Sequence, residues 1–188
     1  QHRRRIETVT SAPLDTIAHA DGVLRAGAGA RLEAVYDALA ADGRAVAAGC
    51  GPTVGISGLA LGGGFGVLGR TYGLLSDQLV RAEVTLADGR SVVCDEAQEP
   101  DLFWALRGAG GTRFGVVTAL ELRTVPAPDL TTFHLVWPAA SAVAAIDAWQ
   151  AWAPDEPDAL AASLLVTAFG DPADPPRVNL FGTMMAGR

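Results

Sequence analysis

Residues 49–73 read GCGPTVGISGLALGGGFGVLGRTYG, and glycine makes up more than a third of them. Glycine loses more backbone entropy on folding than any other residue, so such a density needs a physical reason. A backbone without Cβ atoms can bring its N–H groups close to a phosphate or a planar ligand. Apolar residues such as Val54, Leu59 and Phe65 lie between the glycines, whereas a flexible linker would be polar. The stretch therefore predicts a packed loop that lies against a ligand or against another part of the backbone.

Composition and charge exclude several classes of function. The 188 residues allow one domain, or one domain and part of a second. A net charge of −7 disfavours non-specific binding to nucleic acid or to an acidic membrane, so we expect neither as a partner. All 14 basic residues are arginine, which excludes a phosphate-binding lysine or a Schiff base within this sequence.

The two cysteines, Cys50 and Cys94, are too few for a disulfide framework or a zinc cluster, and no spacing typical of metal ligands appears. No apolar run reaches the roughly 18 residues of a membrane-spanning helix, and no signal peptide is visible. We therefore expect a reduced, cytoplasmic protein without a bound metal. The sequence begins without methionine and stops at Arg188 without an obvious ending, so we also expect it to be part of a longer protein.

Hydrophobic periodicity predicts a mixed α+β chain that divides at Pro126-Ala127-Pro128. Before this point we expect helices at residues 30–41 and 102–107 and strands at 22–27, 44–48, 79–86, 91–94 and 114–125. After it we expect a strand at 131–137, a helix at 139–152 and strands at 160–169 and 178–185. This second group would open a sheet that is not completed before the last residue.

The pattern G-x-G-x-x-G occurs at residues 64–69, so a nicotinamide dinucleotide-binding fold has to be weighed. That fold needs a hydrophobic strand directly before the pattern and a long helix directly after it. Here proline and glycine interrupt residues 52–61, and Gly73 interrupts the residues that follow. The context therefore disfavours a nicotinamide-dependent dehydrogenase.

A different family shares several motifs with this sequence in the same order. They are PTVG at residues 52–55, GLALGGG at 58–64, YGL at 72–74, ADG at 87–89, DLFWALRG at 101–108 and FGVVT at 114–118. Together they resemble the berberine bridge enzyme-like FAD-linked oxidases of the p-cresol methylhydroxylase/vanillyl-alcohol oxidase family. The resemblance covers about residues 12–128, and no diagnostic motif follows.

The resemblance implies an α+β fold with an FAD-binding lobe of the p-cresol methylhydroxylase type and the beginning of an α/β substrate domain. We expect a disordered tail at residues 1–11. Residues 12–128 would form the second lobe of the FAD-binding domain, with the N-terminal lobe missing, and residues 129–188 an incomplete substrate domain.

The resemblance also implies where FAD would bind, with its isoalloxazine ring and pyrophosphate along the glycine-rich loop and its adenine end near Val117. Glycine backbone and the Thr53 hydroxyl would donate hydrogen bonds, and the side chains of Val54 and Val117 would contact ring faces. The residues expected to bind the cofactor are Cys50, Pro52, Thr53, Val54, Gly55, Gly58, Gly62, Gly63, Gly64, Gly66 and Val117.

The implied activity is that of a flavin-dependent oxidoreductase. Such an enzyme transfers a hydride from a C–H bond of a small alcohol, sugar or amine-type substrate to flavin, and dioxygen is the expected final acceptor. No catalytic residue is named, because relatives carry the catalytic base later in the chain, and we expect this chain alone to be inactive. The alternative is a non-catalytic remnant of an FAD-binding lobe that acts at most as a binding module.

Three departures from the family pattern affect the cofactor site. The Gly-Gly-His loop that tethers FAD in many relatives is absent, and we interpret His2 and His19 as surface residues. Some relatives bond flavin to a cysteine directly before PTVG, but that position is Gly51 here and Cys50 stands one residue earlier. A cysteinyl flavin bond and a nearby unbonded thiol both stay open. Leu59 occupies the position where plant-like members place a histidine near the flavin.

Other residues have ordinary structural interpretations. Phe103 and Trp104 are expected to be core residues, and Asp77 is expected to cap or turn the chain after the glycine-rich stretch. His134 is expected to be half-exposed on a strand.

Overall fold

The computed structural model describes residues 14–111, 113–168, 170 and 176–186, which fall into two compact units. Unit 1 contains the described residues up to Phe65 together with Leu74–Pro126. Unit 2 contains Gly66–Gly73 and the described residues from Ala127 onward. The expected tail at residues 1–11, including His2, lies outside the described part of the chain.

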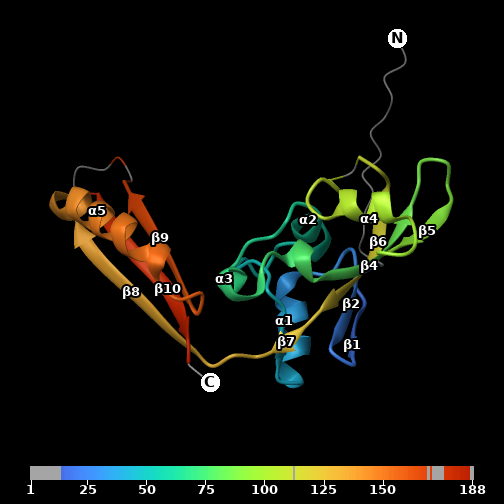
Figure 1. Ribbon diagram of the computed structural model, residues 1–188, viewed down its shortest axis with the longest axis horizontal. Coiled ribbons are helices and arrows are strands. Elements are labelled where there is room, and N and C mark those ends of the chain that lie inside the picture. Colours follow the sequence, from blue (N-terminus) through green and yellow to red (C-terminus); the bar gives the residue numbers. More distant parts are fainter. Residues whose placement is uncertain (1–13, 112, 169, 171–175, 187–188) are drawn as a thin grey trace, which may run out of the picture. The chain divides into compact units, whose positions relative to one another are not determined.

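Unit 1 is built on an antiparallel five-stranded sheet with the strand order β1-β2-β6-β4-β5 (Figure 1). Its strands are β1 (Ile17–Ala20), β2 (Val23–Gly27), β4 (Leu79–Thr85), β5 (Ser91–Cys94) and β6 (Val116–Arg123). A separate two-stranded ribbon pairs β3 (Arg44–Ala45) with β7 (Val125–Pro126). The helical elements are α1 (Leu32–Ala41), α2 (Ile56–Leu61), the 3-10 turn η1 (Leu75–Gln78) and α4 (Pro100–Leu106).

The core of unit 1 lies between α1 and the sheet. Helix α1 buries Leu32, Val35 and Leu39, which share one face because they are three or four residues apart. They join fully buried sheet residues such as Leu24 and Leu120 in one apolar cluster. Each such side chain contributes roughly 1.5–3 kcal/mol when it leaves water.

Two sequence-based expectations in unit 1 are wrong. Trp104 is 77% exposed, because α4 directs Phe103 and Leu106 toward the core and so turns the intervening side chain outward. His19 is no surface residue: its side chain is only 12% exposed. Its Nδ1 lies 3.0 Å from Asp42 Oδ2 and its Nε2 lies 3.4 Å from Thr124 Oγ1, and both partners are remote in sequence.

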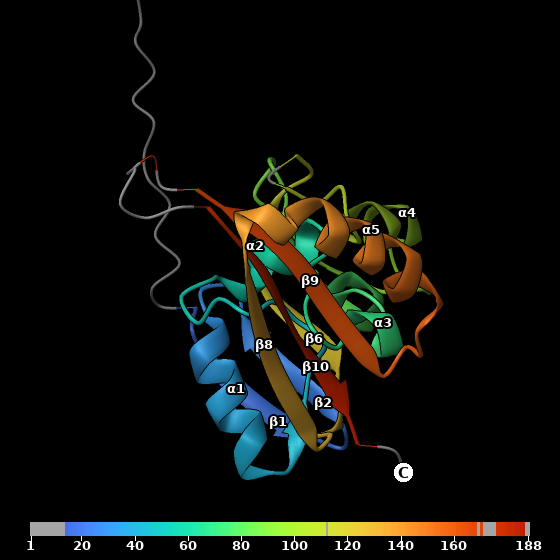
Figure 2. The ribbon, with the colours of Figure 1, turned by 90° about the vertical axis from the view of Figure 1, so that its left-hand side faces the viewer.

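Unit 2 contains an antiparallel three-stranded sheet with the order β8-β10-β9, formed by β8 (Leu130–Pro138), β9 (Leu160–Thr167) and β10 (Arg177–Met185). Helix α5 (Ala142–Trp152) lies across one face of this sheet and is flanked by the 3-10 turns η2 (Ala139–Ser141) and η3 (Ala153–Asp155) (Figure 2). The one-turn helix α3 (Gly69–Tyr72) also belongs to this unit. The expected strand–helix–strand–strand order is confirmed. None of the described helices combines the length and apolar content needed to cross a lipid bilayer.

The strand end at Gly27 offers a test of the fold of unit 1. A Cβ at Gly27 would lie 2.1 Å from the carbonyl oxygen of Leu14, a backbone atom that cannot move aside cheaply. We expect Gly27→Ala to lower the free energy of unfolding by about 2 kcal/mol, measured by urea denaturation followed by circular dichroism. Gly111→Ala is the control, because a Cβ there meets no atom within 4 Å, and we expect a change below about 0.5 kcal/mol. Equal stability of the two variants would contradict this packing.

Candidate cofactor-binding site

The loop at residues 50–55 lies across the N-terminal end of α1. The N–H groups of Leu32 and Glu33 donate hydrogen bonds to the carbonyl oxygens of Val54 and Pro52, each over 3.0 Å. Helix α1 has Arg31 at its N-cap and no side-chain cap, so its first N–H groups need acceptors from elsewhere. The loop backbone supplies these acceptors, and the helix in turn fixes the loop.

Both ends of this loop are attached to the region around α1. At its end, the N–H of Ile56 donates to the carbonyl oxygen of Ala30 over 2.9 Å. At its beginning, the Tyr36 hydroxyl donates a short hydrogen bond to the carbonyl oxygen of Gly49. Burial, and to a lesser extent the charge of Cys50, raises the pKa of Tyr36 to about 12, so this hydroxyl keeps its proton at neutral pH. No motif in the sequence predicts this role of Tyr36, because it depends on a contact with a residue 13 positions away.

The outer surface of the loop combines four exposed side chains with glycine backbone. Cys50, Pro52, Thr53 and Val54 are exposed, and Val54 keeps 39% of its surface accessible. Gly55 and Gly58, the latter in the first turn of α2, are also exposed, and a Cβ built at either position meets no atom within 4 Å beyond its chain neighbours and the backbone of its own helix. The absence of side chains at Gly55 and Gly58 is therefore not required by internal packing. These residues fit a flat ligand that carries phosphates.

The triple glycine differs in this respect. Gly62 is exposed, but Gly63 is buried, and a Cβ at Gly64 would lie 2.7 Å from the Cβ of Leu75. The carbonyl oxygens of Gly63 and Gly64 accept hydrogen bonds from the N–H groups of Ser76 and Leu75 at 2.8 and 2.9 Å. Packing against η1 thus accounts for Gly64 without a ligand.

Two further predicted binding residues lie away from the exposed surface. Val117 is 6% exposed and belongs to the core of unit 1, so its side chain does not offer the expected contact with a ring. Its neighbour Val116 is 49% exposed, because successive residues of β6 point to opposite faces. Gly66 is buried and belongs to unit 2. A contribution of Val117 to a ligand would have to come from its backbone.

A polar groove of about 590 Å³ occupies another part of unit 1, where its lining includes Asp77, Arg81, Asp95 and Arg107. These charges pair with one another, since Arg81 and Arg107 each lie 3.5 Å from a carboxylate oxygen of Asp95 and Asp77, respectively. Asp77 Oδ2 also accepts a hydrogen bond from the N–H of Leu74 over 2.8 Å, which confirms its expected capping role. The pairing leaves these four side chains little net charge for a ligand.

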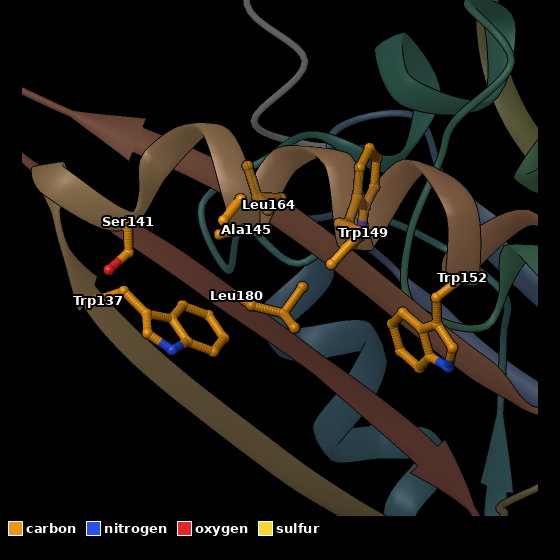
Figure 3. A pocket seen from close by; sticks show the side chains of 9 residues that line it. Trp137, Ser141, Ala145, Trp149, Trp152, Leu164 and Leu180 are labelled. Atoms are coloured by element: carbon orange, nitrogen blue, oxygen red, sulfur yellow. The ribbon is translucent and has the colours of Figure 1, made fainter.

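Unit 2 has an apolar cavity of about 420 Å³ between α5 and the sheet (Figure 3). Trp137, Leu164 and Leu180 line it from the three strands, and Trp149 and Trp152 line it from α5. The Nε1 atom of Trp149 is buried and has no hydrogen-bond partner among the described residues. The described residues that line this cavity include no titratable side chain.

The opposite face of the same sheet carries both polar and aromatic side chains, several of them exposed. His134 is exposed, its Nε2 lies 3.1 Å from Asn179 Oδ1, and its ring meets that of Phe181 edge-on. The Asn179 amide also reaches Thr167 Oγ1 over 3.3 Å. Among the residues that the structure describes, no group of three or more His, Cys, Asp or Glu side chains is placed to hold a metal ion.

Comparison with known proteins relates the chain to FAD-linked oxidoreductases. Residues 9–95 match the family model described as FAD binding domain. An uncharacterised FAD-linked oxidoreductase of Bacillus subtilis is 44% identical over 117 residues, which are 62% of this chain and 26% of that protein. A glucooligosaccharide oxidase of Sarocladium strictum is 43% identical over 113 residues, which are 58% of this chain and 22% of that enzyme.

A solved structure supports the same assignment over more of the chain. The berberine bridge enzyme-like protein 1 of Physcomitrella patens superposes with a TM-score of 0.84 at 30% identity. The superposition covers 93% of this chain and 38% of the moss protein, so the chain spans well under half the length of these relatives. The α+β fold expected from the sequence is thereby confirmed as the FAD-binding type of the p-cresol methylhydroxylase family. The chain thus matches an FAD-binding domain and is similar to FAD-linked oxidoreductases that include the berberine bridge enzyme-like oxidases, whose cofactor is FAD.

Proposed function

We propose that the exposed surface of residues 50–58, which consists of the loop at residues 50–55 and the first turn of α2, binds FAD, and that the whole protein is a flavin-dependent oxidase. One observation carries this proposal: Gly55, at the end of the loop bonded to α1, and Gly58, in α2, are exposed with open space where a side chain would be. A surface that is already ordered binds a planar cofactor without a large cost in ordering. The match to an FAD-binding domain and the similarity to FAD-linked oxidoreductases support the identity of that cofactor.

Each exposed loop residue would have a distinct part in holding FAD. The Thr53 hydroxyl would hydrogen-bond, Pro52 and Val54 would pack against the ring system, and the glycine backbone would face the polar parts of the cofactor. When bound, FAD would accept a hydride from a C–H bond of a small molecule and pass both electrons to dioxygen, which leaves as peroxide. An alcohol, a sugar or an amine-type compound fits this chemistry, and the name of the Sarocladium strictum relative makes a saccharide one candidate.

The domain organisation of this chain and the place of the catalytic residues are also part of the proposal. We propose that residues 12–128 form the second lobe of an FAD-binding domain and that residues 129–188 begin a substrate domain, whose open face carries His134, Asn179 and Phe181. Catalytic residues would lie in the rest of the protein, so this chain alone would bind FAD weakly and have no turnover.

We also propose a reducing, cytoplasmic location, with which the two free thiols are compatible. The alternative to an oxidase is a non-catalytic remnant of an FAD-binding lobe that acts at most as a binding module.

Substitution of Gly58 tests the loop as a cofactor surface. Gly58→Val places a branched side chain on open backbone without an internal clash, so the fold should survive while the ligand surface is blocked. We expect the dissociation constant for FAD to rise at least about tenfold, measured by flavin fluorescence titration of the chain. Gly111→Val, at an exposed position where a Cβ also meets no atom, is the matched control and should leave the affinity unchanged. Wild-type affinity in Gly58→Val would contradict the proposed surface.

Alkylation of the two cysteines tests whether FAD covers Cys50. Cys50 is exposed, whereas Cys94 is buried and its pKa is raised to about 11, chiefly by burial. We expect iodoacetamide to modify Cys50 and spare Cys94 in the native chain, because the thiolate is the reactive form, and we expect FAD to slow the reaction of Cys50. Mass spectrometry of tryptic peptides gives both rates, with Cys94 as the internal control.

Two outcomes of this alkylation would change the proposal. Equal labelling of Cys50 with and without saturating FAD would contradict a cofactor surface at this loop. A Cys50 that stays unlabelled after denaturation of the FAD-loaded chain would show a covalent flavin bond, where we expect an unbonded thiol.

A further inference from the structure

The segment at residues 66–73 makes an excursion from unit 1 into unit 2. Phe65 and Leu74, which flank it, both belong to unit 1, whereas the eight residues between them cluster with unit 2. Two backbone hydrogen bonds close the base of the excursion, from the N–H of Leu75 to the carbonyl oxygen of Gly64 and from the N–H of Ser76 to that of Gly63. We call this pair of bonds the neck.

Within unit 2 the tip of the excursion is held by side chains of α3. Arg70 Nη1 donates to the carbonyl oxygen of Ala153 over 3.0 Å, and Nη2 donates to that of Glu156 over 2.6 Å. The Thr71 hydroxyl donates to the carbonyl oxygen of Asp158 over 2.8 Å. We call these three hydrogen bonds the clamp. All three acceptors are backbone carbonyl oxygens within six residues of the end of α5, and Ala153 is its C-cap.

The clamp supplies what α5 lacks in its own sequence. The carbonyl groups at the C-terminal end of a helix have no intrahelical donors, and they favour a positive charge nearby. Helix α5 has no basic residue in its last turn. Arg70, which is more than 70 positions earlier in the chain, places a positive charge beside this end and donates to the carbonyl oxygen of the C-cap residue Ala153. Its side chain is only 28% exposed, and its Nε lies 3.8 Å from a carboxylate oxygen of the exposed Asp158. Its planar fork suits two carbonyl acceptors at once, which a lysine ammonium could not reach together.

We propose that Arg70 is a positioning residue for the cofactor loop: through the clamp it fixes residues 66–73, and through the neck it fixes the glycine run that follows α2. The proposal rests on the proposed function of the surface at residues 50–58. The physical connection is short, because the remainder of α2 joins that surface to Gly62, and the neck binds Gly63 and Gly64 directly. The residues after α5 and the proposed FAD surface are thereby linked through the clamp and the backbone between Gly58 and Arg70.

Amide hydrogen exchange of the 188-residue chain without FAD tests the mechanical part of this proposal. Arg70→Gln removes the charge and the fork, and we expect exchange at the N–H groups of Leu75 and Ser76 to become about tenfold faster. Arg70→Lys should give an intermediate rate, because it keeps the charge but reaches one carbonyl at a time. Val178→Ala is the matched control, since it opens a cavity at a fully buried residue of unit 2 and leaves the clamp intact. We expect the control to leave exchange at the neck within about twofold of the wild-type rate.

A titration with FAD separates this inference from the proposed function. In a chain that binds FAD, Arg70→Gln should raise the dissociation constant about fivefold and Val178→Ala should not change it. Faster exchange at the neck in Arg70→Gln supports the positioning role even if the wild-type chain binds no FAD, an outcome that would instead refute the proposed function. Wild-type exchange at Leu75 and Ser76 in Arg70→Gln, equal acceleration in Val178→Ala, or an unchanged FAD affinity in Arg70→Gln would overturn the inference.

Discussion

The first N–H groups of α1 have no acceptors within the helix, and the whole arrangement of the loop follows from how they are satisfied. Pro52 and Val54 provide the acceptors through their carbonyl oxygens, so the loop must lie across the helix end with its other side outward. The same helix buries Leu32, Val35 and Leu39 in the core of unit 1. A displacement of the loop would therefore leave the first N–H groups of α1 without these acceptors, so the loop backbone is held to the end of a helix that is anchored in the core.

In the proposed function, the described residues around the loop bind and position the cofactor, and none of them is assigned a proton transfer. Tyr36, whose pKa is raised to about 12, keeps its proton at neutral pH and donates it in a hydrogen bond to the carbonyl oxygen of Gly49. Four charged side chains of the polar groove form two ion pairs, and the described lining of the cavity below α5 includes no titratable side chain. A cofactor that carries its own redox chemistry needs a surface that binds and orients it, which agrees with the match to an FAD-binding domain.

The sequence predicted most elements because local periodicity specifies them. The stripe of Leu32, Val35 and Leu39 indicated α1, and the motifs at residues 52–64 indicated the flavoprotein family that the comparisons confirmed. What it could not predict depends on contacts between distant residues. The caps on α1 and the clamp on α5 join backbone to groups some 20 to more than 80 residues away. The six-residue helix α2 was missed because glycine and proline mask its short pattern, and the inward turn of Val117 depends on the register of β6.

The central claim is that the bare backbone at residues 50–58 is the surface on which FAD lies. Titration of the ¹⁵N-labelled chain with FAD, followed by amide NMR shifts, tests it most directly. The claim predicts that the largest shifts fall on Cys50, Thr53, Gly55 and Gly58, with small ones at the sheet face of unit 2. Shifts centred on the polar groove around Asp95 and Arg107, or on the cavity below α5, with the loop amides unmoved, would contradict it.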